Sequence, residues 1–272
     1  MNYYEALGMN REPFSTSPDP EFFYPSTSHE TALRRLEDTI RQQRGLSVIF
    51  GDVGTGKTTL LRALLQTFKD DKNAIVHMIL DPGYESEFQF LSTLVNFFGI
   101  TPSFRSTLDF KEGLQQYLFQ KAVEEKKIIV LLIDEAQKIS LKNLEVLRML
   151  LNFETNEHKL LQLVIMGQME FLERTRRIKN FSDRIALKYS INPLDAKETS
   201  GMIDYRLRKA GCDQGVSLFT DDALKLVYLH TGGYPRRIAM LCHDALQMMV
   251  TKGVGRVDPE IIRGLVFQEI QI

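Results

Sequence analysis

The chain has few cysteines: Cys212 and Cys242 are its two thiols in 272 residues. Two thiols cannot build a disulfide scaffold, and both fall within helical patterns, which indicates buried and reduced side chains. The five histidines show no metal-ligand spacing, so the sequence gives no sign of a histidine-based metal site. No repeat or low-complexity tract interrupts the chain.

Long apolar runs and a charge excess are absent as well. No stretch reaches the roughly 18 apolar residues that would span a bilayer. Residues 1–14 lack the basic and then apolar segment of an export signal, so the expected address is the cytoplasm. The net charge of -1 gives no global attraction to nucleic acid or to an anionic membrane, although a local basic face remains possible.

The most informative stretch is residues 46–58, LSVIFGDVGTGKT. An apolar strand (46–50) leads into the pattern G-x-x-x-x-G-K-T, and an amphipathic helix follows to Phe68. Glycines let such a loop curl its N–H groups around phosphate oxygens, and the helix start adds its positive dipole end. Lys57 supplies a point charge for the β- and γ-phosphates, and Thr58 a hydroxyl ligand for Mg²⁺. The predicted nucleotide contacts are Gly51, Asp52, Val53, Gly54, Thr55, Gly56, Lys57, Thr58 and Thr59.

A second decisive stretch is IIVLLIDEAQKI (128–139): its first six, apolar residues (128–133) predict a buried central strand, and Asp134 and Glu135 follow at the carboxyl end of that strand. Ligands of parallel α/β sheets bind at the carboxyl ends of the strands. Asp134 is therefore the predicted carboxylate on the Mg²⁺ side, and Glu135 the predicted base that activates the attacking water.

The remaining pattern indicates an α/β fold. Further strands are expected at 74–80, 160–168 and 187–191, which gives a parallel five-stranded P-loop NTPase sheet flanked by helices. Helices are expected within the first 192 residues at 28–44, 60–68, 85–98, 108–125 and 141–154. After Pro193 no strand pattern remains, and four helices are expected at 195–211, 220–231, 234–251 and 258–269.

Three parts follow from this pattern: an aromatic and proline-rich strap with a helix (1–44), the P-loop core (45–192) and a small all-helical lid (193–272). Prolines exclude a long helix from the first 28 residues. The aromatic rings of the strap could cover an adenine base or pack against the protein, and the sequence favours neither.

Several other polar residues have two interpretations. Gln168, at the end of strand 160–168, could lie beside the γ-phosphate or cap the next helix. Arg236 and Arg237 could reach the phosphates or only begin a helix. A basic cluster could supply an arginine finger, contact nucleic acid or form a solvated helix face; its members are Arg174, Arg176, Arg177, Lys179 and Arg184.

Together these motifs resemble the AAA+ ATPases and, within them, the ExeA/GspA family of general secretion pathway ATPases. The resemblance rests on the P-loop, DEAQ (134–137), GQ (167–168), SDRI (182–185) and GGYPRRI (232–238). The N-terminal stretch YYEALGMNREPFSTSPDPEFFYPSTSHETAL is also similar to the family's opening. The resemblance to this family implies ATP and Mg²⁺ as ligands. It also implies sensor 1 at Gln168, an arginine finger for a neighbouring subunit at Arg184 and sensor 2 at Arg236.

The resemblance also implies self-association into a ring or filament and a partner at the inner membrane in a secretion or pilus-type system. GQMEF replaces the family's GQPEL beside sensor 1. ExeA-type proteins continue into a transmembrane helix and a periplasmic region. The sequence printed here ends at Ile272, as expected for a stand-alone ATPase, a shortened relative or a cytoplasmic domain.

Two alternatives remain open at this point. A DNA-binding transposition ATPase of the MuB/TniB type would bind DNA as an ATP-dependent filament. A nucleotide-dependent switch would show negligible turnover.

Overall fold

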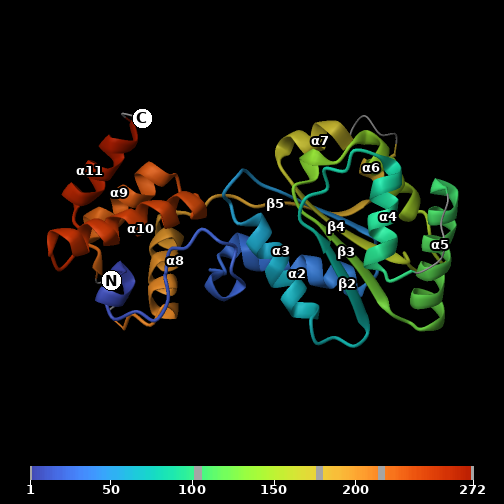
Figure 1. Ribbon diagram of the computed structural model, residues 1–272, viewed down its shortest axis with the longest axis horizontal. Helices are drawn as coiled ribbons and strands as arrows, with labels where there is room; N and C mark the ends of the chain where they lie inside the picture. Colours follow the sequence, from blue (N-terminus) through green and yellow to red (C-terminus); the bar gives the residue numbers. More distant parts are fainter. Residues whose placement is uncertain (1, 101–105, 176–179, 214–217, 271–272) are drawn as a thin grey trace. The chain divides into compact units, whose positions relative to one another are not determined.

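A computed structural model describes residues 2–100, 106–175, 180–213 and 218–270 (Figure 1). In chain order the helices and strands are α1 (Tyr3–Ala6), η1 (Pro20–Phe22), α2 (Thr27–Arg41), β1 (Leu46–Phe50), α3 (Lys57–Phe68), β2 (Ala74–Ile79), α4 (Glu87–Phe97), α5 (Thr107–Phe119), η2 (Gln120–Glu124), β3 (Ile128–Ile133), η3 (Ala136–Lys138), α6 (Leu141–Leu150), β4 (Leu161–Gly167), α7 (Met169–Thr175), η4 (Ser182–Arg184), β5 (Ile185–Ser190), α8 (Ala196–Lys209), α9 (Asp221–Thr231), α10 (Pro235–Lys252) and α11 (Pro259–Ile270).

The five strands form one parallel sheet in the order β2-β3-β4-β1-β5, which confirms the predicted sheet. The central strands β1, β3 and β4 are buried along almost their whole length. Helices cover both faces of such a sheet, so its inner strands read as continuous apolar runs. Because the strands are parallel, β1, β3 and β4 all end at the same edge of the sheet.

Contacts divide the chain into two compact units. The first unit comprises Met1–Ser28, Val53–Thr59 and Asn192–Ile272, and the second comprises His29–Asp52 and Leu60–Ile191. The predicted division into three parts stays a prediction. In the structure, residues 1–28 share a unit with the C-terminal helices.

The core of the second unit lies on both faces of the sheet. On one face, alternate residues of β1, β3 and β4 pack against the apolar sides of α4, α5 and α6. The intervening strand residues, such as Val130 and Met166, are buried as well, so the other face is also covered. The apolar cluster formed with α4, α5 and α6 contains no residue of α2 or α3. The buried leucines of α2 and α3 therefore lie on the opposite face of the sheet (Figure 1).

In the first unit, the four predicted C-terminal helices are present as α8 to α11 (Figure 1). Polar capping residues and a glycine determine where several of these helices begin and end. Thr220 accepts a hydrogen bond from the Ala223 N–H at 3.2 Å and so caps α9, and Asp258 caps α11 through the N–H of Ile261 at 2.9 Å. Gly253 ends α10 with φ 65°, a conformation that favours glycine.

The N-terminal strap packs on these helices. Phe14 and Phe22, exposed by 1% and 6%, belong to the same buried cluster as the cores of α8 and α10. Arg206 of α8 donates to the carbonyl oxygens of Pro13 and Ser15. Burial in the hydrophobic interior therefore accounts for both rings and leaves little of either to cover a base.

Two predicted helices in the second unit extend at least four residues beyond their observed ends. The helix expected at 108–125 ends at Phe119 and continues only as the π-helical turn η2. The helix expected at 141–154 ends at Leu150, because Glu154 forms an antiparallel bridge with Lys159 and the chain must reverse between them.

Candidate active site

The predicted P-loop follows directly from the carboxyl end of β1. Gly51 donates its N–H to the carbonyl oxygen of Gly167 at the end of β4, at 3.2 Å. Gly54 and Gly56 have φ values of +86° and +93°, which only glycine adopts without strain. Helix α3 begins at Lys57, so Lys57, Thr58 and Thr59 form its first turn. This is the strand, loop and helix arrangement that the sequence predicts.

Within the first unit, the P-loop contacts the start of α10. The N–H of Arg236 donates to the carbonyl oxygen of Gly54 at 3.3 Å. A Cβ atom at Gly54 would lie 3.2 Å from the Cβ of Arg236, so a side chain would crowd this contact. Arg237 instead places its guanidinium over the ring of Tyr234, 5.1 Å from the ring centroid. Of the two arginines, Arg236 is therefore the one beside the loop.

The predicted acidic pair lies immediately beyond β3. Asp134 is 2% exposed, and its N–H donates to the carbonyl oxygen of Ile79 at the end of β2. Its Oδ1 accepts the N–H of Glu135 at 2.9 Å. Glu135 has φ 50° and ψ 41°, a left-handed conformation that is uncommon outside glycine and recurs at functional sites.

A hydrogen-bond network that the sequence does not predict surrounds Glu135. Gln137 donates its side-chain Nε2 to Glu135 Oε2, and its Oε1 accepts the N–H of Gln168 at 3.3 Å. Arg174 of α7 donates to the carbonyl oxygens of Gln137 and Ile139, the latter at 2.5 Å. Arg174 thus holds the η3 turn, whereas three of its predicted neighbours (Arg176, Arg177 and Lys179) lie outside the described residues.

An ion pair joins the same turn to the segment after β2. Lys138 Nζ lies 3.0 Å from Asp81 Oδ2. The hydrogen bond from Lys138 lowers the pKa of the Asp81 carboxyl, and the same bond raises the pKa of Lys138. Both side chains are exposed, so the pair contributes little to stability.

Arg184 lies at the end of the sheet where the strands begin, opposite the end where β1, β3 and β4 finish. It directly precedes β5, whose first residue Ile185 pairs with Leu46, the first residue of β1. The six residues of β5 span roughly 20 Å at about 3.3 Å per residue, so Arg184 lies that far from the edge where β3 ends. Its guanidinium donates to Asn152 Oδ1 at 2.7 Å and to the carbonyl oxygen of Asn180 at 2.6 Å. The structure therefore does not bring Arg184 to the carboxylates of its own chain.

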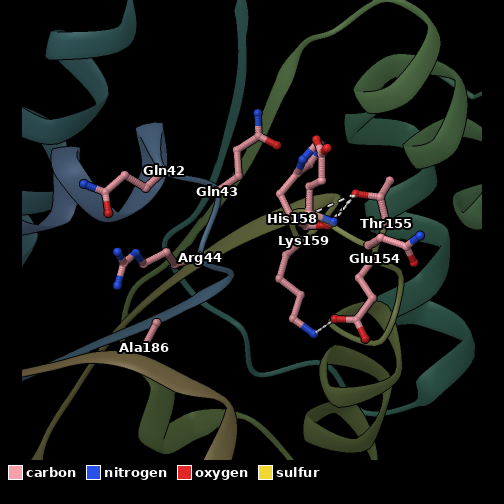
Figure 2. A pocket seen from close by; sticks show the side chains of 10 residues that line it. Gln42, Gln43, Arg44, Glu154, Thr155, His158, Lys159 and Ala186 are labelled. Carbon is pink, nitrogen blue, oxygen red and sulfur yellow. Dashed lines mark hydrogen bonds and ion pairs between the residues drawn. The ribbon is translucent and has the colours of Figure 1, made fainter.

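A polar pocket of about 790 Å³ also lies at the edge where the strands begin (Figure 2). Residues 42–44, residues 154–159 and Ala186 line it, and its Lys159 is paired with Glu154. None of the predicted site residues belongs to this pocket.

Taken separately, Thr58 in the first turn of α3 and Asp134 after β3 each offer an oxygen donor of the kind that fits a magnesium ion. Mg²⁺ prefers carboxylate and hydroxyl oxygens and keeps several of its waters, so one or two protein ligands suffice. Asp134 is buried with one oxygen held by a main-chain N–H, which fixes the direction of its carboxylate.

The P-loop, the acidic pair after β3 and the parallel sheet with its helical C-terminal part define the chain as a P-loop ATPase of the AAA+ class. The chain belongs to the AAA domain family, whose profile matches residues 40–175, half of its 272 residues. It is also similar to general secretion pathway protein A of Aeromonas hydrophila, with 33% identity over 258 residues. That match covers 94% of this chain and 46% of the relative, so the chain spans less than half of that protein.

Solved structures agree on the fold. The chain is similar to Drosophila ORC bound to DNA, with a TM-score of 0.72 and 21% identity; the match covers 97% of this chain and 66% of the ORC chain. The Aeropyrum pernix ORC2 protein has a TM-score of 0.67 at 18% identity, covering 94% and 71%. At these identities the likeness shows the fold alone. In the described part of the chain, none of the helices combines the length and the apolar character that a bilayer span requires.

Proposed function

We propose that this ATPase hydrolyses ATP with Mg²⁺ in a self-assembled ring or filament and couples the reaction to assembly of a secretion or pilus-type envelope system. The similarity to general secretion pathway protein A over 94% of the chain carries the choice of process. In this proposal the chain acts on the cytoplasmic side of the inner membrane through a membrane partner.

Each predicted residue has a role in the proposed reaction. The P-loop main chain and Lys57 bind the phosphates, and Thr58 and Asp134 would hold Mg²⁺, which would neutralise developing charge. Glu135 accepts a proton from the attacking water. Gln168 lies beside the γ-phosphate as sensor 1, Arg236 contacts it from the lid, and Arg184 enters the site of a neighbouring subunit.

Two variants test the base and the loop separately. Lys57→Ala removes the charge that binds the β- and γ-phosphates and should abolish binding of a fluorescent ATP analogue. Glu135→Gln keeps the shape and polarity of the side chain but cannot accept the proton, so it should bind ATP and lose turnover. Normal turnover in Glu135→Gln would remove the base assignment.

A second candidate function is an ATPase that acts on DNA. Its support is the fold likeness to ORC proteins, some of them solved with DNA bound. The net charge of -1 counts against it. Contacts to phosphates would make DNA affinity fall steeply with salt, so a binding titration at two salt concentrations tests it.

One experiment separates the two functions. The ATPase rate per subunit is measured against protein concentration, with and without duplex DNA, while light scattering follows assembly in ATP. A rate that rises with concentration and ignores DNA supports the secretion-type ATPase. Stimulation by DNA together with filaments on it supports the second candidate, and negligible turnover under all conditions supports a nucleotide switch.

A further inference from the structure

Gln137 connects the predicted base to the neighbouring strand of the sheet. It lies in η3, two residues after Glu135, and donates its amide Nε2 to Glu135 Oε2. The other end of the same amide, Oε1, accepts the main-chain N–H of Gln168, which directly follows β4. One half-buried side chain therefore joins the ends of β3 and β4.

The turn that carries Gln137 is held from several sides. Ala136 is fully buried, and its Cβ lies 3.2 Å from where a Cβ at Gly167 would be. The guanidinium of Arg174 fixes the carbonyl oxygens of Gln137 and Ile139. With the turn fixed, the two hydrogen bonds of the Gln137 amide, to Glu135 Oε2 and from the Gln168 N–H, restrict its side-chain torsions.

We infer that Gln137 is a positioning residue for Glu135 in ATP hydrolysis. A glutamate side chain has three rotatable bonds, and a donor bound to one carboxylate oxygen restricts them. Oε2 is the oxygen that accepts this bond, which assigns Oε1 to the attacking water. The inference rests on the proposed role of Glu135 as the base.

Two variants of the full chain test this role. Gln137→Ala removes the donor and should lower kcat by about 10- to 100-fold, the effect of one hydrogen bond to a charged group. The dissociation constant of a fluorescent ATP analogue should change less than about twofold, because no phosphate contact is lost. Gln115→Ala, at an exposed position of α5, is the matched control and should keep the wild-type kcat.

Gln137→Glu gives a readout that a purely structural role would not move. It keeps the length and shape of the side chain, but a carboxylate has no N–H to donate to Glu135 Oε2. It should therefore lower kcat at least as far as Gln137→Ala, with the dissociation constant of the fluorescent ATP analogue again changed less than about twofold. A packing role alone predicts that this isosteric variant keeps the wild-type kcat, and that result would overturn the inference.

Failure of the inference is distinguishable from failure of the proposed function. Normal turnover in Glu135→Gln would remove the base and the inference with it. If Glu135→Gln is inactive but Gln137→Ala keeps the wild-type kcat or exceeds it, only the positioning role is overturned. In the Glu135→Gln background, Gln137→Ala should have no further effect on kcat, since the carboxylate it positions is gone; an additive loss would overturn the inference.

Discussion

The position of Arg184 leads to a quantitative prediction about shared active sites. In its own chain Arg184 lies at the edge where β5 begins, and its guanidinium binds Asn152 and Asn180. The Asp134–Glu135 pair follows β3 at the opposite edge, roughly 20 Å away by the length of a six-residue strand. If Arg184 acts in catalysis, it must act on the site of another subunit.

Mixing two inactive variants tests this reasoning. An Arg184→Ala subunit keeps its own base but offers no arginine to its neighbour. A Glu135→Gln subunit has the reverse defect. A working site then needs an Arg184→Ala subunit next to a Glu135→Gln subunit, so at fraction f of the first variant the active share is f(1−f), with a maximum of about one quarter at equal amounts.

The assay is phosphate release at constant total protein across the full range of mixing ratios. Each variant alone should be slower than wild type by about 10³-fold or more if the arginine contributes as it does in other P-loop enzymes. Mixtures of Lys57→Ala with Glu135→Gln are the control, because no arrangement of these two restores a complete site. A flat line near zero at every ratio of Arg184→Ala to Glu135→Gln would refute an arginine acting between subunits.

Three further predictions concern the fold. Gly233→Ala should lower the free energy of unfolding, measured by urea titration, by about 2–4 kcal/mol, because at φ +75° its Cβ would lie 1.9 Å from the Leu194 carbonyl oxygen. The control Gly253→Ala, whose Cβ would have no atom within 4 Å, should cost only about 1 kcal/mol in the same titration. Burial raises the pKa of the Cys242 thiol, so in a variant with the other cysteine replaced it should react with a disulfide reagent only on unfolding, and fast labelling of native protein would contradict this. Burial lowers the pKa of His77 below its usual 6.5. The unfolded chain therefore binds more protons than the folded chain at low pH, so the stability falls as the pH drops below about 6.5. His77→Phe should reduce that fall, which thermal melts at pH 5 and 7 would measure.

The parts of the fold that could be predicted are those encoded by neighbouring residues. The bounds of β1 and β3 match the predicted strands because strands buried on both faces are apolar throughout. Strand β5 begins at Ile185, two residues earlier than predicted, because it is an edge strand whose residues alternate between half-buried and exposed. The P-loop was predictable because its glycines and Lys57 follow one another in the chain.

The packing of the strap was not predictable, since its partners are distant in sequence. The N–H of Asn10 donates to the carbonyl oxygen of Ala210, and Arg206 binds the carbonyl of Ser15, 191 residues away. No local pattern encodes such pairs. The same holds for Gln137: the letters DEAQ were visible, but its second partner is the main-chain N–H of Gln168, just beyond the end of another strand.

The contacts of Arg184 also bear on how assembly could depend on ATP. Within its own chain the guanidinium already donates to Asn152 Oδ1 and to the carbonyl oxygen of Asn180. To enter a neighbour's site the arginine must exchange these hydrogen bonds, each worth roughly 1.5–3 kcal/mol because the donor is charged, for contacts at least as strong. The triphosphate of ATP offers such contacts through its charged oxygens, whereas ADP lacks the γ-phosphate. We therefore expect subunits to associate through Arg184 when ATP is bound and to release it after hydrolysis, when its bonds to Asn152 and Asn180 become the better alternative.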